Sequence, residues 1–287
     1  MKIILARHFG LCFGVRDAIA QAEEFAQQGP LTILGELVHN NVVHEQLRER
    51  GVQQGSLDDS QSASRRVMIT AHGASDVQRS KWRNAGYEVA DATCPLVRHA
   101  HQELKQLVAA GYHPVVIGRS GHVEVRGLTE DFPGATVVEQ HSELAGVPAR
   151  LRYGVISQTT QPIDFVRQLV GAIRERFPGS EVLFVDTVCR PTKERQLALG
   201  DLIAKAETIV VVGGQHSNNT RQLVQTCRLA GRRAIHVERP EDLNPADFCE
   251  VQVVGLTAGT STLPETVTAV WQRLNEMSSD PDKTKRS

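Results

Sequence analysis

The sequence predicts an α/β fold built from small parallel sheets. Short runs of β-branched and other apolar residues alternate with amphipathic helical patterns, and many runs stop at a Gly, Ser, Thr, Asn or His cluster before a helix begins. This alternation indicates repeated βα units, whose strands lie parallel. Eleven strands are predicted, more than one small sheet needs: Lys2–Ala6, Leu31–Leu34, Val67–Thr70, Tyr87–Ala90, Pro114–Ile117, Thr136–Val138, Tyr153–Ser157, Glu181–Val185, Thr208–Val212, Ala234–Val237 and Val251–Leu256.

Three cysteines indicate that the chain contains a coarse repeat. Cys12, Cys94 and Cys189 each follow a predicted strand and precede a predicted helix, and they are separated by about the length of one small α/β unit. We therefore predict three similar units. Their bounds are 13–93, 94–187 and 188–277, with strand 1–12 completing the third unit, a polar loop at Gln53–Arg66 and a flexible tail at 278–287.

The overall composition argues against a broadly charged binding surface. The 287 residues include 32 Lys and Arg against 33 Asp and Glu, so we expect no non-specific binding to nucleic acid or to an anionic membrane. An apolar run of only four residues precedes Arg7 and His8, which favours neither a signal peptide nor a membrane span. We expect a cytoplasmic protein, in which five widely spaced cysteines are ligands, nucleophiles or core residues rather than disulfides.

The repeated cysteines are candidates for a shared metal centre. A thiolate at the start of a helix lies near the positive end of the helix dipole, which lowers its pKa and favours metal binding. Three thiolates on a 4Fe-4S cluster would leave one iron open to a substrate. The alternative is that Cys12, Cys94 and Cys189 are unrelated core residues. Cys227, on a helical apolar stripe, and Cys249, in apparent alternation on a strand, are predicted to be structural.

A second set of polar residues follows the predicted strand ends. Ligands of parallel α/β sheets gather at the carboxyl ends of strands, where helix N-termini also bind anions, so these positions suit a diphosphate. The alternative is that each residue is an ordinary helix cap or surface group. The set comprises His39, Asn40, His72, His122, Glu124, Ser217, Asn218, Asn219 and Ser261.

Two further interpretations of these residues remain open. Imidazole and carboxylate groups suit zinc or non-haem iron, so His122 and Glu124 could form a metal site with His39 and His72. Glu124 could instead act as a general acid if its surroundings raise its pKa, although an exposed glutamate is the default expectation.

Taken in order, short motifs over nearly the whole chain resemble the LytB family of hydroxymethylbutenyl diphosphate reductases. The motifs are Gly10-Leu11-Cys12-Phe13-Gly14-Val15, Val38-His39-Asn40, Ala71-His72-Gly73, Asp91-Ala92-Thr93-Cys94-Pro95, His122-Val123-Glu124-Val125, Gln158-Thr159-Thr160, the segments 186–196 and 217–219, and Thr257-Ala258-Gly259-Thr260-Ser261. The resemblance implies a pseudo-threefold cloverleaf around one 4Fe-4S cluster on Cys12, Cys94 and Cys189.

The resemblance also implies an activity and a role for each site residue. The substrate would be (E)-4-hydroxy-3-methylbut-2-enyl diphosphate, reduced to isopentenyl and dimethylallyl diphosphate in the last step of the methylerythritol phosphate route, with ferredoxin or flavodoxin as electron donor. Glu124 would deliver a proton with help from Thr159 and His122. His122 and Thr159 would also contact the substrate. The diphosphate would be held by His39, His72, Ser217, Asn219 and Ser261, with Asn218 beside them.

The sequence departs from the family pattern at two positions. Val123 stands where members often have proline, and Asn218 stands where they often have serine. The leading hypothesis is therefore an allylic diphosphate reductase, with a paralogue for another allylic diphosphate as an alternative. A non-catalytic iron–sulfur sensor and a zinc hydrolase that uses the histidines are the competing hypotheses.

Overall fold

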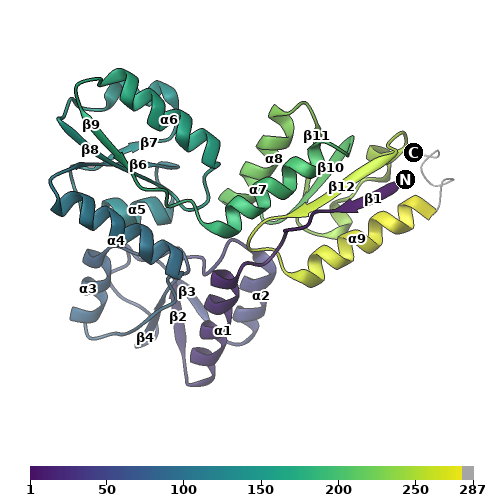
Figure 1. Ribbon diagram of the computed structural model, residues 1–287. Helices are drawn as coiled ribbons and strands as arrows, with labels where there is room; N and C mark the ends of the chain where they lie inside the picture. Colours follow the sequence, from purple (N-terminus) through teal and green to yellow (C-terminus); the bar gives the residue numbers. More distant parts are fainter. Residues whose placement is uncertain (280–287) are drawn as a thin grey trace. The chain divides into compact units, whose positions relative to one another are not determined.

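The computed structural model describes residues 1–279, which form three four-stranded parallel sheets with helices packed on them (Figure 1). This confirms the predicted fold class. The chain divides into two compact units. We call residues 1–13, 39–41 and those from 190 onward the terminal unit, and residues 14–38 and 42–189 the internal unit.

The terminal unit contains one sheet, in which the first strand of the chain pairs with the last. β1 (Lys2–Leu5) lies parallel beside β12 (Val253–Ala258), and β10 (Thr208–Val212) and β11 (Arg233–Val237) complete the sheet in the order β11-β10-β12-β1. In Figure 1 the purple first strand runs alongside the yellow last strand.

Helices cover both faces of this sheet. Side chains on a strand alternate between the two faces, and here both faces carry apolar side chains that pack against helices. Val210 and Val212 of β10 pack with residues of α9 (Pro264–Ser279) on one face. Ile209 and Val211 pack on the other face with α7 (Arg190–Ile203) and α8 (Asn218–Leu229). A strand that is buried on both faces has no polar alternation, which explains the continuous run Thr208–Val212.

The internal unit contains the other two sheets. The first has the order β3-β2-β4-β5, from β2 (Leu31–Leu34), β3 (Gln53–Gly55), β4 (Arg66–Ile69) and β5 (Glu88–Asp91), with helices α1 (Phe13–Gln27), α2 (Asn41–Glu49) and α3 (Asp76–Asn84). The second has the order β7-β6-β8-β9, from β6 (His113–Ile117), β7 (Thr136–Val138), β8 (Arg152–Ser157) and β9 (Glu181–Phe184), with helices α4 (Pro95–Ala109), α5 (Val123–Thr129) and α6 (Ile163–Arg176).

All three sheets share one topology. In each sheet the strand that comes second in sequence lies at one edge, followed by the first, the third and the fourth, provided that β1 counts as the fourth strand of the terminal sheet. The residue bounds of the three predicted units, and their pseudo-threefold arrangement around a centre, stay predictions.

Two details of the sequence interpretation were wrong. The predicted polar loop Gln53–Arg66 contains a twelfth strand, β3, whose exposed glutamines gave no apolar signal and which pairs only with β2. Cys249 does not lie on a strand: it is exposed and caps a short 3₁₀-helix, Pro245–Phe248. Of the predicted tail 278–287, Ser278 and Ser279 belong to α9, and residues 280–287 lie outside the described residues.

No helix within residues 1–279 has the length and apolar character needed to cross a membrane.

Candidate functional site

Each of the three predicted ligand cysteines occupies the same topological position in its sheet. Cys12 follows β1, Cys94 follows β5 and Cys189 follows β9, which are the fourth strands of the three sheets. Each cysteine is also the residue immediately before a helix, since α1, α4 and α7 begin one residue later. Their thiols are therefore near helix N-termini, where the partial positive charge favours a thiolate.

Backbone hydrogen bonds fix the three cysteine loops. The N–H of Cys12 donates to the carbonyl of Thr260 at 3.0 Å, within the terminal unit. In the internal unit, the N–H of Cys94 donates to Ala71 at 3.0 Å and that of Cys189 donates to Thr159 at 2.9 Å. All three cysteines are half-buried.

The surroundings of Cys94 leave room for its sulfur. Gly14, the second residue of α1, lies against the thiol, and a Cβ at this position would collide with Sγ of Cys94. Glycine therefore allows the helix to approach the sulfur closely. Half-buried thiols at helix starts, together with the space kept beside Cys94, fit an iron–sulfur ligand set.

A complete ligand set is not contained in one unit. Cys12 belongs to the terminal unit, whereas Cys94 and Cys189 belong to the internal unit. Taken alone, the described residues of either unit bring no three His, Cys, Asp or Glu side chains together as a metal-ion site. The three-cysteine centre is therefore carried forward as part of the proposed function.

The predicted polar residues follow the two middle strands of each sheet. His39 and His72 come after β2 and β4, and His122 and Thr159 come after β6 and β8. Ser217 to Asn219 and Ser261 come after β10 and β12 in the same way. Since neighbouring parallel strands end on the same side of a sheet, His122 and Thr159 lie at one end of the sheet β7-β6-β8-β9. Ser217 to Asn219 and Ser261 lie in the same way at one end of the terminal sheet.

The terminal unit joins His39, Asn40 and Ser261 directly. The hydroxyl of Ser261 donates to the carbonyl of His39 at 3.0 Å, and Nδ2 of Asn40 donates to the carbonyl of Ser261 at 2.6 Å. A Cβ on Gly214 would lie 2.7 Å from the carbonyl oxygen of His39, so glycine is needed after β10. The segment His39–Asn41 is thereby held against Ser261, which lies more than 220 positions later in the sequence.

Ser217, Asn218 and Asn219 form the buried start of helix α8. The hydroxyl of Ser217 caps the helix by accepting from the N–H of Thr220 at 3.3 Å, and Oδ1 of Asn219 accepts from the N–H of Thr260 at 3.0 Å. All three side chains are at most 5% exposed. A helix N-terminus lined with neutral donors, next to the end of β12, is suited to binding an anion. We call His39, Asn40, Ser217–Asn219 and Ser261 the anion cradle.

The internal unit buries the predicted acid. Glu124 is 1% exposed, and its Oε1 accepts from the N–H of Thr159 at 2.6 Å. Burial raises the pKa of Glu124 to about 7, although the hydrogen bonds from Thr159 act in the opposite direction. Glu124 can therefore hold a proton near neutral pH and give it to a reacting group. The default expectation of an exposed glutamate was wrong.

Two histidines lie near this acid. His122 is the N-cap of α5, and its Nδ1 accepts from the N–H of Glu124 at 3.1 Å. The rings of His122 and His72 meet edge to face, with their centroids 5.7 Å apart. We call Glu124, Thr159, His122 and His72 the acid cluster. Because Thr159 also accepts from the N–H of Cys189, the acid cluster is tied to one of the cysteine loops.

Comparison with known proteins identifies the family. The model of the family described as LytB protein matches residues 3–275. The chain belongs to the LytB family. It is 34% identical to the 4-hydroxy-3-methylbut-2-enyl diphosphate reductase of Geotalea uraniireducens over 98% of this chain and 99% of the relative. It is 36% identical to the reductase of the same name from an Anaeromyxobacter species over 91% of this chain and 93% of the relative.

Two solved structures extend the LytB match to the fold. The E-1-hydroxy-2-methyl-but-2-enyl-4-diphosphate reductase from Plasmodium falciparum superposes with a TM-score of 0.89 at 26% identity, covering 99% of this chain and 89% of that one. A structure titled as (E)-4-hydroxy-3-methyl-but-2-enyl diphosphate reductase, the terminal enzyme of the non-mevalonate pathway, gives a TM-score of 0.67 at 32% identity. It covers 96% of this chain and 100% of that one.

The sequence analysis missed two arginines of this LytB protein whose side chains hydrogen-bond to residues near Cys12 and Cys94. Arg195 is 5% exposed and donates to the carbonyls of Gly10, two residues before Cys12, and Pro191. Arg79 binds residues beside Cys94 in the internal unit. Arginine is common on exposed helix faces, so only the tertiary contacts reveal these two.

Proposed function

We propose that the chain reduces (E)-4-hydroxy-3-methylbut-2-enyl diphosphate to isopentenyl and dimethylallyl diphosphate, the last step of the methylerythritol phosphate route. The observation that carries the proposal is Glu124, a buried acid with a pKa of about 7 in a chain that belongs to the LytB family. Relatives at 34% and 36% identity over nearly their full length bear the name of this reductase.

The reaction requires electrons, protons and a leaving group. The allylic carbon–oxygen bond of the substrate breaks, two electrons and two protons are taken up, and the oxygen leaves as water. Cys12, Cys94 and Cys189 would hold one 4Fe-4S cluster, which when bound supplies the electrons and a Lewis-acidic iron. Ferredoxin or flavodoxin is the proposed electron donor, in a cytoplasm that keeps thiols reduced.

Glu124 is the proposed proton donor. A hydroxide is a poor leaving group, so a proton must reach the departing oxygen as the bond breaks. The short bond from the Thr159 N–H fixes one carboxyl oxygen of Glu124, which leaves Oε2 as the atom that carries the transferable proton. Thr159 and His122 help by orienting the acid, because both bond directly to Glu124 through backbone or ring atoms.

The anion cradle is proposed to bind the diphosphate. Ser217, Asn219 and His39 offer donors at the ends of β10 and β12, and Asn218 lies beside them on the first turn of α8. Ser261 would turn its one hydroxyl proton from the His39 carbonyl to the diphosphate. From the internal unit, His72 is the proposed ligand of the diphosphate. Donors that hold the diphosphate orient the allylic end of the substrate without taking part in proton transfer.

The test is an anaerobic assay with the hydroxymethylbutenyl substrate and a reduced viologen dye, in which both dye oxidation and products are measured. We expect substrate-dependent dye oxidation and the two isopentenyl-type products. Dye that stays reduced, with a cluster present, would favour an iron–sulfur sensor. One zinc and no iron in anaerobically prepared protein would favour a hydrolase. Turnover only with a different allylic diphosphate would identify a paralogue.

A further inference from the structure

We propose that Arg79 is a positioning residue that ties the loop bearing Cys94 to the loop bearing His72, so that one side chain sets both a cluster ligand and a substrate ligand. The inference rests on the proposed function for the meaning of those two residues. The contacts themselves lie wholly within the internal unit.

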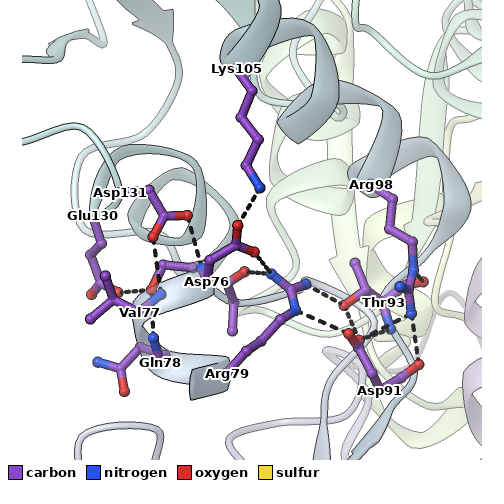
Figure 2. Close-up of polar contacts among 12 residues, drawn as sticks. Asp76, Val77, Gln78, Arg79, Asp91, Thr93, Arg98, Lys105, Glu130 and Asp131 are labelled. Carbon is purple, nitrogen blue, oxygen red and sulfur yellow. Dashed lines mark hydrogen bonds and ion pairs between the residues drawn. The ribbon is translucent and has the colours of Figure 1, made fainter. Parts of the chain in front are cut away.

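The guanidinium of Arg79 donates hydrogen bonds to Asp91 at the end of β5, to the loop that follows it and to the β4–α3 loop (Figure 2). It also forms an ion pair with Asp76 of its own helix, at 3.6 Å. Nε donates to Oδ2 of Asp91 at 3.0 Å, and Nη2 donates to Oγ1 of Thr93, the residue before Cys94, at 3.1 Å. Nη1 donates to the carbonyl of Ala74, two residues after His72. The side chain is only 12% exposed. Arg79 therefore bridges the β4–α3 and β5–α4 loops.

Asp91 organises the Cys94 side of this bridge. Its Oδ1 accepts from both the N–H and the hydroxyl of Thr93. Arg98 closes the same loop from α4, since Nε donates to the Thr93 carbonyl at 3.2 Å and Nη2 donates to the Asp91 carbonyl at 2.9 Å. Burial alone would raise the pKa of Asp91, but the bond from Thr93 and the charge of Arg79 lower it below its ordinary value. A permanent carboxylate thus anchors the loop.

Helix α3 holds Arg79 in a fixed place. Asp131 accepts from the N–H groups of Asp76 and Val77 at the start of the helix, at 2.8 and 3.1 Å. Ser75 caps the helix and donates to Glu130 at 2.7 Å. Figure 2 shows these bonds on the opposite side of Arg79 from Asp91. The arginine therefore projects from a helix whose first turn is already bound to another part of the unit.

Only the planar guanidinium of arginine has enough N–H donors, at fixed angles, to bond to all three acceptors. Lysine could not reach Asp91, Thr93 and Ala74 together, because its single nitrogen lacks the fixed spread of donors. The two loops also pack tightly, since a Cβ on Gly73 would lie 3.0 Å from Cγ2 of Thr93. A shift of one loop is therefore passed to the other.

The experiment compares Arg79→Gln and Arg79→Lys with Arg83→Gln in the full-length protein. Arg83 is an exposed arginine on the same helix, so Arg83→Gln removes an equal charge without touching either loop. Two quantities are measured: the alkylation rate of Cys94 in metal-free protein, with the exposed Cys249 as internal reference, and the rate of iron release to a chelator from loaded protein.

In both Arg79 variants we expect Cys94 to be alkylated several-fold faster than in Arg83→Gln. Iron should be released about tenfold faster, as for other changes to residues behind a metal ligand. Equal Cys94 alkylation in Arg79→Gln, Arg79→Lys and Arg83→Gln would overturn the proposal. Because alkylation is measured without metal or substrate, this result is independent of the proposed function, which fails separately if wild-type protein turns over no substrate.

A second variant separates the two loops. Thr93→Val keeps the methyl packed on Gly73 but removes the hydroxyl that Arg79 and Asp91 hold. We expect Thr93→Val to speed Cys94 alkylation but to raise KM less than Arg79→Gln does, because Arg79 still holds Ala74. Arg79→Gln should also raise KM several-fold through His72. An unchanged KM in Arg79→Gln would overturn the link between the loops.

Discussion

The anion cradle and the acid cluster occupy equivalent ends of similar sheets but differ in chemistry. The cradle in the terminal unit consists of the serine and the asparagines at the start of α8, the hydroxyl of Ser261, and His39 with Asn40. The acid cluster in the internal unit gathers a buried glutamate and two histidines. One repeated topology therefore supports both a site of mostly neutral hydrogen-bond donors and a site that can exchange protons near neutral pH.

The largest effects are expected from changes to the cysteines, because the two units are proposed to share one cluster. Cys12→Ser, from the terminal unit, and Cys94→Ser, from the internal unit, should each lower bound iron by more than about tenfold and abolish turnover, because even changes behind a metal ligand cost about 10- to 100-fold in affinity. Iron and sulfide analysis measures this, with Cys249→Ser as the exposed control. Full iron content in Cys12→Ser would show that the terminal unit supplies no ligand.

Glu124→Gln should separate chemistry from binding. The amide keeps the size of the side chain and can accept from Thr159 but has no proton to give, so kcat should fall by about 100- to 10,000-fold with little change in KM. Steady-state dye oxidation gives both constants. Glu175→Gln, at an exposed position on α6, serves as control. A large rise in KM at unchanged kcat would move Glu124 from proton transfer to binding.

The cradle should show the opposite pattern. Ser217→Ala removes a neutral donor proposed to hold the diphosphate, and the cap of α8 with it, so KM should rise by about 10- to 100-fold, in line with about 1–3 kcal/mol for a lost buried hydrogen bond. The value of kcat should change far less. Thermal unfolding of the same variant reports the capping loss separately. If kcat falls and KM stays constant, the cradle takes part in chemistry.

The pH dependence of turnover should belong to the acid cluster alone. Burial raises the pKa of Glu124 to about 7, so the proton donor is present below that pH and lost above it. We expect kcat to be level on the acid side and to fall about tenfold per unit above pH 7. In wild type and in Ser217→Ala, kcat should begin to fall at the same pH. If that pH changes in Ser217→Ala, the titrating group would belong to substrate binding instead of proton transfer.

The smallest effect is expected at Asn218, the position where family members often have serine. Asn218→Ser exchanges one neutral donor for another on the first turn of α8, so KM should change by less than about tenfold, given about 0.5–1.5 kcal/mol for a hydrogen bond. The value is measured with the hydroxymethylbutenyl substrate and with a second allylic diphosphate. A reversal of preference between the two substrates would make Asn218 the specificity determinant.

Local sequence patterns located most of the fold. Eleven of the twelve strands within residues 1–279 lie within two residues of their predicted bounds, because buried parallel strands are short continuous apolar runs. β3 was missed since its residues, Gln53 to Gly55, carry no apolar signal and form a strand only by pairing with β2. The cysteine repeat likewise anticipated the shared position after each fourth strand.

By itself, the sequence determined the residue types, their places at strand ends and the family, since these depend on local patterns. Tertiary structure alone decided the pKa of Glu124, because its carboxyl group is buried and bonded to Thr159, which lies 35 positions later in the chain. It also decided the role of Arg79, whose three acceptors lie at the end of β5 and on the loops after β4 and β5. Electrostatic environment and hydrogen-bond partners are properties of the folded neighbourhood, which no single segment specifies.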